Sequence, residues 1–91
     1  MIWIIGISGS HMDNVFTYRV EGNEEQVRKH LFELVEEDRE SETYSTWERG
    51  TESIDDVVPI GDNRLYAFGR WDDYHNDYTA TPQEEIMILE D

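Results

Sequence analysis

One amphipathic segment constrains the fold of this chain more than any other feature of its sequence. Asn23 is a good helix N-cap, and Gln26 three residues later completes a capping box. Glu24 and Glu25 fall in the first turn, where the helix dipole favours negative charge. Apolar residues then follow at the spacing i, i+4, i+7 and i+8: Val27, Leu31, Leu34 and Val35. We expect a helix from Glu24 to about Asp38 that buries this stripe.

Most of the remaining chain has the pattern of short β-strands. Residues 15–20 alternate apolar and polar side chains with the period of a half-buried strand. Residues 43–49 and 65–71 are rich in β-forming residues. Residues 54–60 are ambiguous, because Pro59 restricts them to an edge strand or a loop. Strands therefore flank the helix on both sides in the sequence.

Two stretches, residues 50–56 and 72–82, are predicted to be long polar loops, and residues 85–90 a final short strand. The apolar run at residues 1–8 adds another candidate strand. This order predicts one α+β domain over residues 1–91, with a single helix packed on a mainly antiparallel sheet of four to five short strands. We expect the helix to pack on a sheet that contains four aromatic residues: Phe16, Tyr18, Tyr66 and Phe68.

The start of the chain has two interpretations. Residues 9–12 read Gly-Ser-His-Met, the tetrapeptide that a cleaved expression tag commonly leaves, so residues 1–12 are either native or a leader. The chain has no Cys, which excludes a disulfide framework and fits a reducing compartment. No apolar run approaches the ~20 residues that span a bilayer. These features predict a soluble, cytoplasmic protein.

The charge is strongly acidic and unevenly distributed. Asp and Glu number 22 against 7 Lys and Arg, which gives a formal net charge of -15. Residues 33–62 hold eleven acids against two arginines, and residues 72–91 hold seven acids and no base. Because nucleic acids and anionic membranes bind proteins through Lys and Arg, we expect neither to be a direct partner. The predicted partner is a basic protein.

The predicted helix carries a single file of carboxylates at i, i+3, i+4 and i+7: Glu33, Glu36, Glu37 and Glu40. Like charges at i, i+4 destabilise a helix, and acids in its last turn oppose the dipole. A file that breaks these rules is expected where a partner needs it, although a merely solubilising face is the alternative. Neighbours in the file lie roughly 5 to 6 Å apart, close to the spacing of successive phosphates. The file is therefore a candidate partner-binding site.

A second acidic segment, predicted to be a loop, mixes acids with aromatic residues. Trp and Tyr supply buried area at interfaces, and carboxylates meet Arg or Lys of a partner. The alternative is that the aromatic residues only cover the sheet. The candidate partner-binding residues here are Asp72, Asp73, Tyr74, Asp77 and Tyr78.

In size, lack of Cys, charge and interleaved aromatics, residues 21–91 resemble the small acidic phage-encoded proteins that mimic DNA and disable host defence enzymes, such as restriction and CRISPR complexes. Those proteins share no motif, so the resemblance assigns no individual residue. It implies an inhibitor that occupies the basic nucleic-acid-binding surface of a partner, within the cytoplasm of a host cell.

The sequence contains no P-loop, nucleophile-elbow or zincin motif, and we expect neither an enzyme nor a bound cofactor. His75 and its neighbouring acids offer metal donors, but their spacing matches no EF-hand, so no metal site is expected. Two functions remain: a nucleic-acid mimic, and an acidic adaptor or regulatory subunit that docks on one basic protein. The sequence also leaves open whether the chain forms a homodimer.

Overall fold

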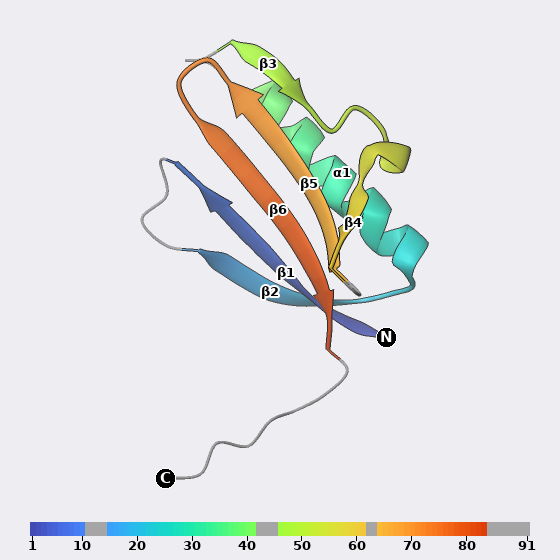
Figure 1. Ribbon diagram of the computed structural model, residues 1–91. Helices are drawn as coiled ribbons and strands as arrows, with labels where there is room; N and C mark the ends of the chain where they lie inside the picture. Colours follow the sequence, from blue (N-terminus) through green and yellow to red (C-terminus); the bar gives the residue numbers. More distant parts are fainter. Residues whose placement is uncertain (11–14, 42–45, 62–63, 84–91) are drawn as a thin grey trace, which may run out of the picture.

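The computed structural model describes residues 1–10, 15–41, 46–61 and 64–83. One helix packs on one face of an antiparallel sheet, which confirms the predicted α+β class (Figure 1). The sheet has six strands, one more than expected. In chain order the elements are β1 (Ile2–Gly9), β2 (Phe16–Glu21), α1 (Glu24–Ser41), β3 (Trp47–Gly50), the 3-10 helix η1 (Ile54–Asp56), β4 (Val58–Ile60), β5 (Arg64–Trp71) and β6 (His75–Pro82).

The strand order is β2-β1-β6-β5-β3, and β4 pairs with the first half of β5 on the same side as β3. Strand β6 is central, because it pairs with β1 on one side and β5 on the other. Alternation along the strands gives the sheet two distinct faces. The face toward α1 carries a buried core that includes Trp3, Ile5, Leu65 and Ala67.

The predicted capping box forms at the start of α1. The Asn23 N–H donates to Gln26 Oε1 over 2.9 Å, and the Gln26 N–H donates to Asn23 Oδ1 over 2.8 Å. Val27, Leu31 and Val35 are buried on the sheet. The apolar stripe is thus confirmed, and the helix runs three residues beyond the predicted Asp38.

The four aromatic residues expected in the sheet lie on β2 and β5, and of these Tyr18 meets α1, with its hydroxyl oxygen 2.6 Å from His30 Nε2. Helix α1 packs across β5 and β6, whereas β2 is the far edge strand (Figure 1). Phe16 therefore stays 63% exposed. Tyr66 and Phe68 alternate with the buried Leu65 and Ala67, so they lie on the opposite face. The prediction that the helix packs on a sheet containing these four residues is confirmed, although Phe16 is exposed and Tyr66 and Phe68 lie on the face away from α1.

The structure corrects the loop predicted for residues 72–82. Only residues 72–74 form the turn, and the remainder is β6. The ambiguous residues 54–60 form η1 and the short edge strand β4. The predicted strand at residues 85–90 lies outside the described residues. Within the described residues, no helix has the length and apolar character needed to cross a membrane.

Candidate partner-binding surface

The four carboxylates of the α1 file, Glu33, Glu36, Glu37 and Glu40, are all exposed. The opposite stripe of the helix is buried on the sheet, so the file lies on the outward side of α1. Lys29 approaches Glu33 at 3.9 Å, with both side chains largely exposed. An exposed pair of this kind contributes little to stability. The file is held on a rigid element and offers its charge to solvent.

The other two bases of α1 are directed away from the file. Arg28 approaches Glu24 at 3.2 Å and donates to the Val57 carbonyl oxygen. Arg39 donates to Glu52 over 2.9 Å. The guanidinium carbon of Arg39 also lies 4.7 Å from the centroid of the Trp47 ring. The hydrogen bonds and ion pairs of these two cations therefore go to residues outside the file, while Arg39 also lines a groove with Glu36 and Glu40.

Shallow grooves flank the file on its η1 side. One groove is lined by Glu36 and Glu40 together with Phe32 and Arg39. Its neighbour lies between α1 and η1 and is lined by three acids and one base: Glu25, Glu52, Asp55 and Lys29. Apolar Phe32 lines both grooves. A partner's Arg or Lys could place its methylene groups on Phe32 and its charge among the carboxylates.

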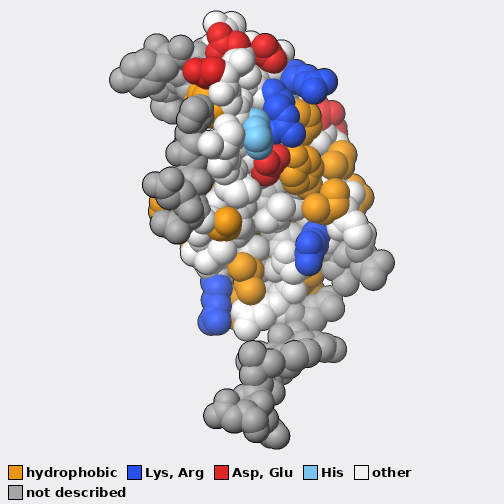
Figure 2. All heavy atoms as spheres, turned by 60° about the vertical axis from the view of Figure 1, so that its left-hand side comes forward, with side chains coloured by type: hydrophobic (Ala, Val, Ile, Leu, Met, Phe, Trp, Pro, Cys, Tyr) orange, Lys and Arg blue, Asp and Glu red, His pale blue; other side chains and the backbone are white. Residues whose placement is uncertain are grey.

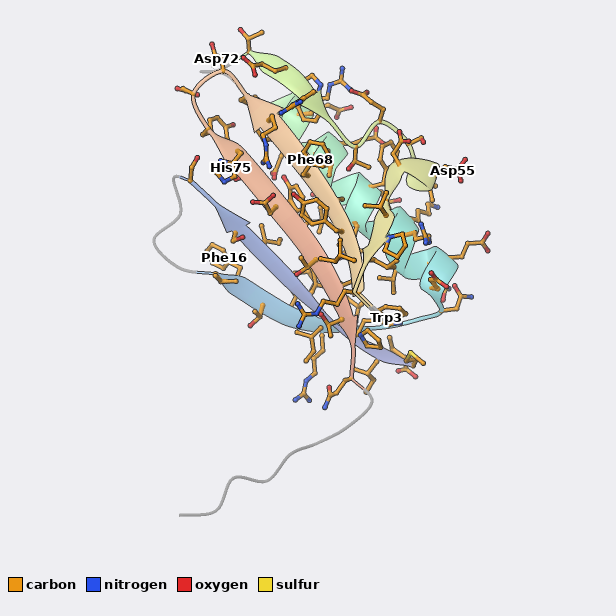
Figure 3. All side chains as sticks on the ribbon, in the orientation of Figure 1. Trp3, Phe16, Asp55, Phe68, Asp72 and His75 are labelled. Carbon is orange, nitrogen blue, oxygen red and sulfur yellow. The ribbon has the colours of Figure 1, made fainter. Side chains whose placement is uncertain are left out.

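The turn between β5 and β6 holds Asp72 and Asp73, both exposed, and half-buried Tyr74. Tyr74 stacks on Trp71, with ring centroids 4.7 Å apart and an interplanar angle of 4°. Asp72 Oδ1 accepts a hydrogen bond from the Thr46 N–H over 3.2 Å. This turn and the C-terminal end of α1 lie at the same end of the molecule (Figures 1 and 3). The file and these turn residues therefore share one acidic end.

Tyr78, in contrast, is fully buried in the core on β6. Its hydroxyl donates a hydrogen bond to Asp38 Oδ2 on α1, and Asn76 Nδ2 donates to the same oxygen over 3.2 Å. Burial and the adjacent Asp38 raise the pKa of Tyr78 well above its ordinary value. The assignment of Tyr78 to a partner-binding loop was wrong, because the side chain is part of the core.

Asp77, like Tyr78, is not part of the candidate surface. It lies on β6 with its side chain on the sheet face opposite α1, where Tyr66 donates to its Oδ1 over 2.5 Å. Arg70 approaches it at 3.5 Å and His75 at 3.6 Å. Burial and this hydrogen bond raise the pKa of Tyr66. Asp77 is therefore engaged by neighbouring side chains on a different face from the file.

Sequence reasoning missed the arginines that the sheet gathers on the face opposite α1. Arg64 and Arg70 alternate with the buried Leu65, Ala67 and Trp71, so this pattern in residues 64–71 was a usable signal. The proximity of Arg70 to Arg49 depends on the pairing of β3 with β5, which local sequence does not reveal.

Comparison with known proteins identifies no relative of this chain: no family model, curated protein or solved structure matches it. Among the described residues, no three His, Cys, Asp or Glu side chains are arranged to hold a metal ion.

Proposed function

We propose that this protein is an acidic inhibitor that occupies the basic nucleic-acid-binding surface of a partner protein. The observation that carries the proposal is the exposed file Glu33, Glu36, Glu37 and Glu40 on the outward side of α1. Its opposite side is anchored by buried Leu31 and its neighbours, so the carboxylates are presented by a fixed scaffold. Because the helix backbone is already fixed, it loses little further freedom on binding.

Electrostatics supports a charge-driven contact. Like charges within one helix repel, and the bases Arg28 and Arg39 are committed elsewhere. Binding a groove lined by Arg and Lys relieves this repulsion, and it substitutes carboxylates for the phosphates that such a groove accepts. Asp72 and Asp73 at the same end extend the acidic surface beyond the helix.

The competing function is an acidic adaptor whose affinity comes from aromatic anchors. Of the two candidate anchors, Tyr78 is buried, and Tyr74 is half-buried and stacked on Trp71. Interface hot spots are usually large side chains that fill a pocket on the partner. Because Tyr78 is buried and cannot anchor a partner, binding through the carboxylates is favoured over binding through aromatic anchors.

The experiment that tests the proposal is competition. The protein is immobilised, cell lysate is passed over it at low salt, and retained proteins are eluted with duplex DNA or single-stranded RNA. Elution of a nucleic-acid-binding protein by either polymer supports the mimic. Retention of the specific partner at saturating nucleic acid rejects mimicry and leaves the adaptor.

A further inference from the structure

The sheet face opposite α1, called here the open face, is apolar at its centre and basic at its margins. Strand pairing arranges its side chains in rows across the sheet. The first row is Arg19, Ile4, Thr81, Arg64 and Ile60; the second is Thr17, Gly6, Thr79, Tyr66 and Val58. The third contains Ser8, Asp77 and Phe68, and the fourth His75, Arg70 and Arg49.

Hydrophobic side chains are unusually accessible on this face. Ile4 is 37% exposed and Val58 45% exposed. Tyr66 and Phe68 stack on each other with centroids 5.9 Å apart and an interplanar angle of 11°. Figure 2 shows hydrophobic side chains gathered here with Lys or Arg side chains among them. Exposed apolar surface of this kind usually marks a contact site.

Within these four rows of the open face the charge is opposite to that of the molecule, and Glu21, next to Arg19 on the same face of β2, lies just outside them. Four of the seven bases of the chain lie in its rows: Arg19, Arg49, Arg64 and Arg70. The one acid within these four rows, Asp77, is already engaged by Tyr66, Arg70 and His75. An occupant of this face must therefore combine apolar side chains with negative charge.

Arg49 and Arg70 are the clearest reason to expect negative charge on the occupant. They are direct partners across the β3–β5 pair. Like charges directly opposite each other destabilise a sheet. Arg70 also lies over the Phe68 ring, with its guanidinium carbon 5.2 Å from the centroid. A carboxylate placed at this row would relieve the repulsion.

We propose that the occupant of the open face is the C-terminal segment of the same molecule, residues 84–91. Its sequence matches the face in order: two acids, four apolar residues and two acids, namely Glu84, Glu85, Ile86, Met87, Ile88, Leu89, Glu90 and Asp91. If the segment returns along β6, the first acids meet the row of Arg19 and Arg64. The apolar residues then cover Ile4, Tyr66 and Phe68, and the last acids reach Arg49 and Arg70.

The segment is long enough. Strand β6 ends at Pro82, beside the first row of the open face. From that row to the fourth, Thr81 to His75, the strand advances roughly 20 Å. Eight residues span up to about 26 Å when extended. The segment therefore covers the four rows with length left for the reversal.

Other occupants satisfy the face less well. A symmetric pair of open faces would bring eight arginines together. The outward side of α1 from a second copy offers carboxylates but no apolar stripe for Tyr66 and Phe68, because its stripe is buried. Nucleic acid is repelled by the net charge of -15.

The chain has no native Cys, which permits a clean test in the full-length protein. Met87→Cys carries a nitroxide spin label, and the loss of amide signal intensity is measured by NMR. We expect loss at Tyr66, Phe68 and Thr79 of the open face, and little at Val27 and Leu31 under the sheet. The same label at Glu36→Cys, on the outward side of α1, is the matched control and should cause much less loss on the open face. Signals of the open face that remain unaffected by the label at position 87 overturn the proposal.

Two further arms complete the test. Spin-labelled protein without nitrogen-15 is mixed with nitrogen-15 protein without a label, so that only contact between molecules causes signal loss. Loss in this mixture overturns the proposal in favour of a second copy. Glu90→Lys with Asp91→Lys, outside the described fold, should restore the signals at Phe68 and Arg70, whereas unchanged signal loss removes the predicted role of charge.

Discussion

The hydroxyl group of Tyr78 donates a hydrogen bond to Oδ2 of Asp38, which joins the central strand of the sheet to the C-terminal half of α1. Both residues belong to segments that also carry candidate binding residues, but this bond lies on the buried side of the helix. Asn76 donates to the same oxygen, so the carboxylate is held from two positions on β6. The contact fixes the outward orientation of the file.

We predict that Tyr78→Phe lowers the free energy of unfolding by about 1 to 3 kcal/mol, because a carboxylate in a half-buried position loses one donor. Urea unfolding of Tyr78→Phe, Asp38→Ala and the double variant measures the coupling between the two side chains. A coupling energy near zero would contradict a stabilising bond.

The raised pKa of Tyr78 predicts a loss of stability at alkaline pH. The unfolded chain releases this proton near the ordinary pKa of 10.0, whereas the folded chain retains it. The contribution of Tyr78 to the free energy of unfolding is therefore fully present below about pH 10. Above that pH it declines, by up to about 1.4 kcal/mol per pH unit. Tyr18 and Tyr66, whose pKa values are also raised, add to the decline.

The measurement is urea unfolding between pH 7 and pH 11. Tyr78→Phe should show a shallower decline above pH 10 than the unmodified protein. Equal slopes would mean that the folded state does not hold the Tyr78 proton.

Leu31 tests the packing of α1. It is fully buried beneath the helix, so Leu31→Ala should cost roughly 2 to 5 kcal/mol of stability. Glu33→Ala, on the exposed side of the same helix turn, is the control and should change stability by less than about 0.5 kcal/mol. Similar melting temperatures for Leu31→Ala and the unmodified protein would refute the assignment of the buried side.

The net charge predicts a stability that rises with salt, because ions screen repulsion among the acids. Melting temperatures measured from low to moderate ionic strength provide the test. Replacement of Glu33, Glu36 and Glu40 by Lys should flatten this dependence without unfolding the protein. A flat profile for the unmodified protein would show that its charges are already compensated.

The sequence predicted α1 and the exposure of its file well, because caps and helical periodicity are local signals. Asn23, Gln26 and Leu31 act within a few residues of one another or on one helix face. Strand β6 was missed for the opposite reason. His75, Asn76 and Asp77 are weak β-formers, and the strand is stabilised by pairing with β1 and β5, which are distant in sequence.

Because β6 was missed, two of the candidate binding residues were assigned to the wrong place. Once residues 75–82 form a strand, alternation sends Tyr78 into the core and Asp77 to the open face. The meeting of Arg49 and Arg70 likewise depends on register between strands. The predicted site was therefore reliable where it lay on one helix and unreliable where it required strand pairing.

Binding to the captured partner tests the central claim most directly. The dissociation constant is measured for the unmodified protein and two charge-matched variants. One replaces Glu33, Glu36 and Glu40 of the file with Lys; the control replaces the exposed Glu21, Glu48 and Asp56 with Lys. Reversal in the file should weaken binding roughly 100-fold or more, because like charges across an interface cost several kcal/mol and about 1.4 kcal/mol is tenfold. The control should bind much more tightly than the file variant, whereas equal losses in both, or no loss in the file variant, would contradict a binding role for α1.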